Sequence, residues 1–340
     1  MAATMQDVAR LAGVSTKTVS NVVNDFPRVS PETRQRVEAA ILKLGYEVNI
    51  SARNLRRGRT GVIGLALPEL KLPYFAELAD SVIVEAERQG LRVIIEQTNS
   101  NRTREIEVLL NQSRSMVDGL IFSPLALGQE DIHLFQVGYP LVLLGERVFE
   151  PTNDHVTMSN VEAAKAATRH LIDSGRRRIA LVGAHPGETV GSAILREQGY
   201  RAALAEAGLP SDEELVVSGG MWHRNTGAAA TDHLIESGVD FDAIFALNDA
   251  MAIGALHSLH AHGREVPSDV AVVGFDDIED ASYTSPTLTT VDPGREQIAR
   301  EAVALLQHRM SESGRPATER TPIRRIIADY QVRVRESSAS

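Results

Sequence analysis

The sequence predicts two parts with different folds: an all-α N-terminal headpiece and an α/β body built from two lobes. Short amphipathic helix patterns separated by glycine occupy residues 1–48. From residue 61 onward, continuous apolar runs alternate with helical patterns, which is typical of parallel sheets covered by helices. The net charge also changes sign between the parts. With 340 residues, 43% of them hydrophobic, the chain is long enough to form both.

The charge distribution indicates that only the N-terminal part meets a polyanion. Residues 1–60 hold 10 Lys and Arg and 5 Asp and Glu, a formal charge of +5, whereas the remaining residues carry −15. A basic end on an acidic body favours binding to nucleic acid through that end. A solvated basic tail is the alternative, and the regular helix patterning opposes it.

Composition also excludes several classes of site. The chain has no cysteine, which excludes disulfides, a thiolate nucleophile and cysteine-based zinc sites. No apolar segment approaches the length of a membrane span, and the N-terminus lacks the apolar core of a secretion signal. We therefore expect a cytoplasmic protein that does not enter a membrane.

The first helix is predicted from Met5 to Ala12. Met5, Val8 and Ala12 fall on one helical face, and Gly13 ends the pattern. Ser15 is placed to cap the next helix.

The second and third helices complete the headpiece. The second has an apolar stripe and an opposite face made of Thr16, Lys17, Ser20, Asn21 and Asn24. Ser30-Pro31 suits the start of a third helix, with serine as N-cap and proline in the first turn. Gly45 ends it. Helix, tight turn, helix and a bracing third helix predict a helix-turn-helix, with a generic three-helix bundle as the alternative.

Several motifs carry a family resemblance. "MQDVARLAGVSTKTVSNVVN" and "VSPETRQRVEAAILKLGY" closely resemble the DNA-binding headpiece of LacI/GalR-family transcriptional regulators. The resemblance continues through "NISARNLRRGRTGVIGLALP", "VDGLIFSP", "ALNDAMAIGAL" and "VAVVGFDD", and covers nearly the whole chain.

The resemblance implies which headpiece residues meet DNA. Thr16, Lys17 and Asn21 take the base-contacting positions of the second helix, and lysine suits guanine O6 and N7. Asn21 departs from the family, which usually has arginine there, so an altered half-site is expected. Residues suited to phosphate contacts are Thr4, Ser15, Ser20 and Ser30. For Ser15 and Ser30, helix capping alone is the alternative.

Residues 49–60 resemble the hinge helix and linker of the family. The resemblance implies that this segment folds when two copies meet on DNA, with Leu55 inserted into the minor groove. The hinge residues expected at DNA are Ala52, Arg53, Leu55 and Arg56. An ordinary basic linker is the alternative.

The body is predicted to hold eight parallel strands in two Rossmann-like lobes. The runs are "VIGLALP", "RVIIE", "GLIFSP", "PLVLLG", "RIALVG", "LVVSGG", "AIFALND" and "VAVVGFDD", with a break near residues 159–160. The resemblance implies a periplasmic-binding-protein-like (type I) body, in which the chain crosses between lobes more than once. The expected lobes are 61–159 with 289–321, and 160–288 with 322–340.

Polar residues follow the strand ends, where ligands bind in open α/β sheets. They include Ser123, Glu146, Arg147, His185, Asn248, Asp249 and Asp276, with Trp222 shortly after its strand. This set follows from strand position alone.

The resemblance implies an effector site in overlapping positions. The effector residues expected are Tyr74, Phe75, Ser123, Glu146, Arg147, Arg196, Trp222, Asn248 and Asp276. Acceptors and an indole face suit a sugar. As alternatives, Asn248 and Asp276 cap loops, Phe75 belongs to the core, and Arg196 pairs on a helix surface.

No motif predicts catalysis, a metal or a cofactor. Of His257, His260 and His262, only the first two lie on one helical face, and no phosphate-binding loop or nucleophile motif appears.

We therefore expect a ligand-responsive transcriptional regulator that is not an enzyme: a repressor that binds a palindromic operator as a homodimer and is released by a small sugar-like effector. Alternatives are a corepressor-dependent regulator that responds to a nucleoside or another metabolite, a sugar-binding protein without a regulatory role, and an enzyme that carries the headpiece as an appendage.

Overall fold

The computed structural model describes residues 3–23, 26–46, 59–110, 116–339. The chain divides into two compact units, residues 1–60 and 61–340.

The first unit is a bundle of three short helices, α1 (Met5–Ala12), α2 (Thr16–Val23) and α3 (Pro31–Leu44). Its core is formed by Val8, Ala9, Ala12, Val19, Val22, Val37 and Ala40. Gly13 ends α1 with a left-handed φ of 66°, and Gly45 ends α3 in the same way at 57°. The Oγ of Ser15 accepts from the amide of Thr18 at 3.1 Å, and Ser30 accepts from Thr33 at 3.3 Å. The predicted helix-turn-helix is confirmed.

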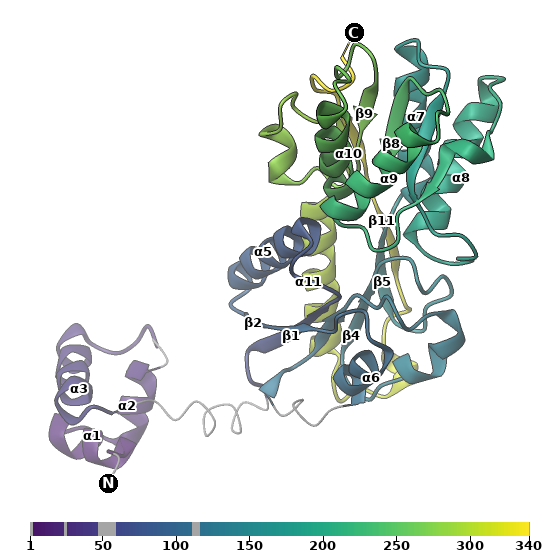
Figure 1. The fold of residues 1–340 in the computed structure, drawn as a ribbon. Helices are drawn as coiled ribbons and strands as arrows, with labels where there is room; N and C mark the ends of the chain where they lie inside the picture. The colour runs from purple at the N-terminus through teal and green to yellow at the C-terminus, as the bar shows by residue number, and fades with distance from the viewer. Residues whose placement is uncertain (1–2, 24–25, 47–58, 111–115, 340) are drawn as a thin grey trace. The chain divides into compact units, whose positions relative to one another are not determined.

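The second unit begins with a six-stranded parallel sheet in the order β11-β5-β4-β3-β1-β2. Its strands are β1 (Val62–Leu67), β2 (Arg92–Gln97), β3 (Leu120–Phe122), β4 (Leu141–Leu144), β5 (Asp154–Met158) and β11 (Arg325–Ala328). Helices α5 (Pro73–Arg88) and α11 (Arg295–Ser311) lie side by side on one face (Figure 1). The other face is covered by α6 (Arg102–Leu110) and the 3₁₀ helix η2 (Gln129–Phe135).

Alternate residues of these strands supply two separate cores. Ile63, Leu65 and Leu67 of β1 face α5 and α11, whereas Ala66 joins the core under α6. Both faces of a parallel sheet are buried, so the strands appear in the sequence as continuous apolar runs.

The second lobe repeats this architecture with four parallel strands in the order β7-β6-β8-β9. The strands are β6 (Ile179–Ala184), β7 (Val216–Ser218), β8 (Ala243–Ala246) and β9 (Ala271–Val273). One face packs against α7 (Asn160–Asp173) and α8 (Ser192–Glu206), and the other against α9 (Arg224–Glu236) and α10 (Asp249–Ala261). Short 3₁₀ helices at Glu213–Leu215, Glu279–Ser282 and Ala317–Glu319 complete the unit. All eight predicted runs are strands, and the two-lobe fold class is confirmed.

The chain crosses between the lobes three times, and two crossings differ from the prediction. The first lies between β5 and α7. The strand β10 (Thr290–Asp292) pairs with β12 (Gln331–Arg333) beside the second sheet, so the chain enters the first lobe at α11 and not at residue 289. It leaves after β11, which pairs with β5, and not at residue 321. These strands have three or four residues with charged members, which is too short for a periodic signal.

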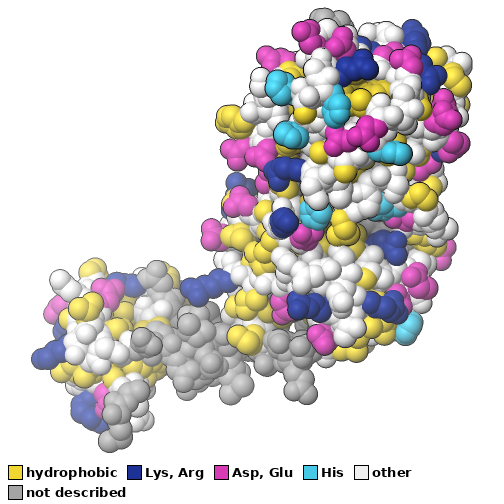
Figure 2. Space-filling model, viewed as in Figure 1, with side chains coloured by type: hydrophobic (Ala, Val, Ile, Leu, Met, Phe, Trp, Pro, Cys, Tyr) yellow, Lys and Arg dark blue, Asp and Glu magenta, His cyan; other side chains and the backbone are white. Residues whose placement is uncertain are grey.

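The outer surface of the second unit is charged but mixed. On the face drawn in Figure 2, acidic and basic side chains are interspersed over the whole unit. The acidic excess of the body is therefore not gathered into one patch on this face.

Two glycines set the close approach of the helix pairs in the second lobe. A Cβ on Gly254 of α10 would lie 2.0 Å from the carbonyl oxygen of Arg224 at the start of α9. A Cβ on Gly199 of α8 would lie 2.2 Å from that of Val161 on α7. The neighbours are backbone atoms, so they cannot rotate away.

We therefore expect Gly254→Ala to lower the free energy of unfolding by about 1–3 kcal/mol, because the added methyl must separate α9 from α10. Chemical denaturation of the two proteins measures this. Gly138→Ala is the matched control, since nothing lies within 4 Å of its Cβ. Equal stability of Gly254→Ala and the wild type would contradict the packing described here.

Candidate functional site

A cavity of about 250 Å³ lies between the two lobes, beyond the carboxyl ends of the strands. Both lobes line it. All nine residues expected at an effector site are in its wall: Tyr74, Phe75, Ser123, Glu146, Arg147, Arg196, Trp222, Asn248 and Asp276. The structure brings this set together in one cavity.

Arg196 is a buried cation in the wall of this cavity. It lies on α8 and is only 2% exposed. Its Nε donates to Asn160 Oδ1 at 2.8 Å, its Nη1 donates to the carbonyl of Leu247, and its Nη2 lies 3.6 Å from Asp276 Oδ1. The guanidinium carbon stands 3.6 Å from the ring centroid of Phe275. Arg196 is therefore not a surface pairing residue; it connects the starts of α7 and α10 with the end of β9.

Asp276 faces Arg196 from the segment after β9. Its backbone has φ 116°, a conformation that non-glycine residues rarely adopt and that is often found at binding sites. Burial raises the pKa of its carboxyl to about 7, while Arg196 and Arg295 oppose that shift. Its carboxylate pairs with Arg196, so it does not serve simply as a loop cap.

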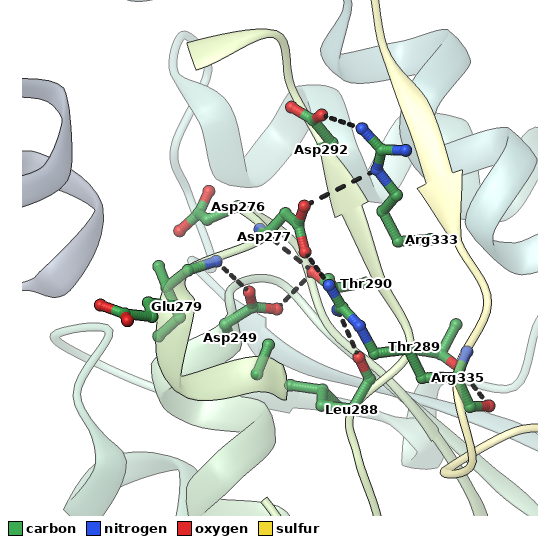
Figure 3. A network of polar contacts seen from close by, with 12 residues as sticks. Asp249, Asp276, Asp277, Glu279, Leu288, Thr289, Thr290, Asp292, Arg333 and Arg335 are labelled. Carbon is green, nitrogen blue, oxygen red and sulfur yellow. Dashed lines mark hydrogen bonds and ion pairs between the residues drawn. The ribbon is translucent and has the colours of Figure 1, made fainter. Parts of the chain in front are cut away.

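A network of polar contacts holds the Asp276 segment in this conformation (Figure 3). Asp249 is fully buried; its Oδ1 accepts from Thr290 Oγ1 at 2.5 Å and its Oδ2 from the amide of Ile278 at 3.0 Å. Arg335 Nη2 donates to Asp277 Oδ1 at 2.6 Å. The segment that presents Asp276 is thus fixed from both sides, by α10 and by the residues after β12.

The same segment contacts the first lobe. The amide of Glu279 donates to Glu77 Oε1 on α5 at 2.9 Å, and Arg295 pairs with Glu77 Oε2 at 2.9 Å. Arg295 also donates to the carbonyl oxygen of Asp276 at 3.1 Å. The carboxylate of Glu77 therefore links closure of the lobes to the position of Asp276.

Trp222 closes the cavity from the turn before α9. Its Nε1 donates to the carbonyl of Gly183 at 2.9 Å, and its ring centroid is 5.6 Å from that of His185. Asn248 Nδ2 donates to the Trp222 carbonyl at 3.1 Å, and Asn248 Oδ1 accepts from the amide of Met251 at 2.8 Å. Asn248 is thus the N-cap of α10, as the alternative reading had it, and also lines the cavity.

Glu146 and Arg147 reach from the first lobe to the second. Ser192 Oγ donates to Glu146 Oε2 at 2.6 Å, and Arg147 Nη1 donates to the carbonyl of Val190 at 2.5 Å. The Nε of Arg147 is buried without a hydrogen-bond partner in the described part of the chain. An unpaired buried donor in a cavity wall is costly unless a ligand atom accepts from it.

The remaining first-lobe residues form an apolar side of the cavity. Tyr74 and Phe75 begin α5, with ring centroids 5.3 Å apart at 69°. Phe75 also packs against the core of the first lobe, so it serves both roles that the sequence left open. Burial raises the pKa of the Tyr74 hydroxyl, which keeps it neutral.

Sequence reasoning missed a carboxylate that shapes this side. Glu105 of α6 is fully buried, and it accepts from the amides of Leu125, Ala126 and Leu127 at 2.7–3.1 Å. Ser123 and Leu125 line the cavity, so Glu105 fixes the loop that carries them. The available signal was an acidic residue one turn from Leu109 on the apolar face of a helical pattern.

In the first unit, the polar face of α2 is left outside the core. Thr16 and Lys17 in its first turn are exposed, and Ser20 and Asn21 are half-buried. Thr4 is exposed and caps α1, where its Oγ1 accepts from the amide of Asp7 at 3.3 Å. Ala52, Arg53, Leu55 and Arg56 lie outside the described residues.

Within the described residues no three His, Cys, Asp or Glu side chains are grouped as metal ligands would be. Over the same ranges, no helix is both long and apolar enough to cross a bilayer.

Comparison with known proteins decides the family. The family model described as "Bacterial regulatory proteins, lacI family" matches residues 4–49, and "Periplasmic binding protein-like domain" matches residues 168–338. The HTH-type transcriptional regulator CelR of Thermobifida fusca is 36% identical over 346 residues, which cover 98% of each chain. The chain belongs to the LacI family of bacterial regulatory proteins. It is therefore a ligand-responsive DNA-binding transcriptional regulator.

Solved structures of other LacI-family proteins resemble this one over most of its length. A putative regulator from Sanguibacter keddieii is 48% identical, with a TM-score of 0.76, and covers 83% of this chain and 100% of its own. A complex of a regulator CelR with cellobiose is 33% identical, with a TM-score of 0.71 and coverage of 98% and 99%. The lac repressor dimer bound to operator and an anti-inducer is 25% identical, with a TM-score of 0.83 and full coverage of both chains.

The raised pKa of Asp276 predicts a pH-dependent effect of its replacement. The pKa of Asp276 is about 7 in the folded protein and near 3.9 in the unfolded chain. Between about pH 4 and pH 7 the folded state therefore binds more protons than the unfolded state. The free energy of unfolding of this LacI-family chain falls as pH rises through that range. Asn cannot ionise. The stability of Asp276→Asn relative to the wild type should therefore rise by at least about 1 kcal/mol from pH 5 to pH 8.

Denaturation of both proteins at the two pH values measures this difference. Asp240→Asn, at a carboxylate whose side chain is 90% exposed, is the control for the same chemical change outside the cavity. A constant difference for Asp276→Asn would mean that the Asp276 carboxyl titrates as an ordinary acid.

Proposed function

We propose that this chain is a repressor that binds a palindromic operator as a homodimer and is released when a small sugar-like effector fills the cavity between the lobes. The single observation that carries the proposal is that cavity. Its wall is shared by two lobes connected by three crossings of the chain. A ligand that contacts both walls must change the balance between closed and open lobes.

DNA recognition is assigned to the first turn of α2. Lys17 and Thr16 are exposed there, whereas Val19 and Val22 of the same helix are buried. An exposed lysine at this end of a second helix suits the major groove, where it donates to guanine. The surplus of five positive charges in residues 1–60 supplies attraction to the phosphates. Two-fold symmetry of the operator requires two headpieces, and the similar lac repressor binds its operator as a dimer.

Effector chemistry follows from the donors and acceptors of the wall. Asp276 and Glu146 supply carboxylate oxygens, Arg196 and Arg147 supply N–H groups, and Trp222 supplies an indole face. Hydroxyl groups both donate and accept, so a sugar satisfies these groups together, while its apolar ring face suits the indole. The similar CelR was solved with cellobiose, which is consistent with this class.

We further propose that the protein works by binding alone and acts in the cytoplasm, where its DNA lies. Ligand binding and DNA binding at separate sites supply regulation through their coupling, without a chemical step.

Lys17→Ala should weaken binding to the selected operator by about 1–3 kcal/mol and reduce the preference for operator over random DNA, because it removes a base contact. The operator is first obtained by selection from random duplexes, and affinities are measured by fluorescence anisotropy. Lys43→Ala removes the same charge from the last turn of α3 and should weaken binding to both DNAs by similar factors. Loss of equal size on both DNAs for Lys17→Ala would contradict the base-contacting role.

The effector class is tested by titrating the protein with a panel of sugars and nucleosides while following Trp222, the only tryptophan. We expect a saturable change with a sugar, retained in the fragment 61–340, which forms a compact unit by itself. Arg196→Lys should weaken this response at least about tenfold, since lysine cannot replace the forked contacts of the guanidinium.

Arg201→Lys is the matched control: it lies on the same helix but pairs outside the cavity with Glu197 and Glu213. A response to nucleosides alone, or an unchanged response in folded Arg196→Lys, would exclude the proposed sugar site.

A further inference from the structure

His185 joins two loops at the rim of the cavity. It follows β6, and its Nδ1 lies 2.8 Å from Glu188 Oε2 within the β6–α8 loop (residues 185–191). Its Nε2 lies 2.7 Å from the carbonyl oxygen of Gly220 in the β7–α9 turn (residues 219–223). One imidazole therefore bridges the two segments that carry Glu188 and Trp222 into the cavity wall.

Both partners of this imidazole are acceptors. A carboxylate and a backbone carbonyl offer no hydrogen, so each contact needs an N–H from the ring. Neutral imidazole has one N–H, and only the imidazolium has two. The neutral ring would leave a lone pair against one of the two oxygens, at a distance that suits a hydrogen bond. The geometry therefore matches the charged form.

The turn that receives this contact is closely packed. A Cβ on Gly219 would lie 2.2 Å from Met251 Cε and 2.8 Å from Gly183 Cα, so the turn rests directly on α10 and β6. Gly220 has a left-handed φ of 55°. Trp222 follows immediately and is anchored to β6 through the carbonyl of Gly183, 5.6 Å from the His185 ring.

The charged neighbours act in one direction. Glu188 is the carboxylate on the same loop, and its hydrogen bond is the main reason that the pKa of His185 is raised, followed by the Gly220 carbonyl, while burial opposes both. Arg147 reaches the loop from the first lobe at Val190. The guanidinium carbon of Arg196 lies 5.2 Å from the centroid of the Trp222 ring, and Arg196 is paired with Asp276. His223, next to Trp222, pairs with Glu69 of the first lobe at 3.3 Å.

We propose that His185 is a positioning residue of the cavity: as the imidazolium it ties the β6–α8 loop to the β7–α9 turn and fixes the indole of Trp222, so that this wall is ordered at low pH and loosens when His185 loses its proton. The contacts between Glu188, His185 and the Gly220 carbonyl are called the His185 clasp below. Its consequence for an effector rests on the proposed function, whereas the clasp itself does not.

The sign of the pH dependence follows from the clasp. A histidine that gains an acceptor when folded contributes fully below its unfolded pKa, near 6.5, and the contribution is lost as pH rises through the higher folded pKa. The wall that carries Trp222 is therefore more ordered at pH 6 than at pH 9, and an effector that stacks on the indole should bind more weakly at the higher pH.

The test uses the ligand-free full-length protein, so it does not depend on the effector. Emission of Trp222 and its quenching by acrylamide are followed from about pH 5 to about pH 9. An imidazolium quenches a neighbouring indole, so we expect emission to rise through a midpoint above about 6.5, with easier acrylamide quenching above it. His185→Gln should lose this titration, and Glu188→Gln should move its midpoint to lower pH.

His223→Gln is the matched control and should keep the wild-type midpoint, since that ring is outside the clasp. Asp276→Asn shows whether the nearby carboxyl of Asp276, and not His185, causes the change in emission. A titration that persists in His185→Gln, or that disappears only in Asp276→Asn, would overturn the proposal, as would an unchanged midpoint in Glu188→Gln. Failure of every sugar and nucleoside in the panel would count against the proposed function and leave these outcomes unaffected.

Discussion

The cavity depends on the hydrogen bonds and the ion pair that the buried guanidinium of Arg196 makes. A cation removed from water is costly unless its hydrogens are satisfied and an opposite charge is near. Here the guanidinium donates to Asn160 at the start of α7 and to the carbonyl oxygen of Leu247 after β8. Asp276 provides the opposite charge. Phe275 supports its face. Because these partners lie on separate elements, the ion pair fixes the relative positions of the strand ends that form the cavity.

Asp276 shows how that arrangement extends across the molecule. The residue has an unfavourable backbone conformation, and its segment is held by the buried Asp249 and by Arg335 beyond β12. The same segment meets Glu77 of the first lobe, both directly and through Arg295. A change at the Asp276 carboxylate can therefore reach α5 through the adjacent residues of its own segment and through Arg295, so no long chain of contacts is needed.

The sequence was sufficient for the eight strands that consist of continuous apolar runs, such as β1 and β4. It was also sufficient to collect Ser123, Glu146, Asn248 and Asp276, because polar residues at the carboxyl ends of parallel strands converge. It failed for β5, β10, β11 and β12, where runs such as "DHVTM" and "QVR" are short and include polar or charged residues. Glu105 and the His185–Glu188 contact depend on loop conformations that no periodicity reports.

The central claim is that one ligand acts on both the cavity and the DNA-binding unit. The most direct measurement is the affinity of the full-length protein for its selected operator, with and without a saturating amount of the compound that changes Trp222 emission. The account predicts that the compound weakens operator binding by about five-fold or more, and that operator weakens binding of the compound by the same factor, since coupling is reciprocal. Saturation of the cavity with no change in operator affinity would contradict it.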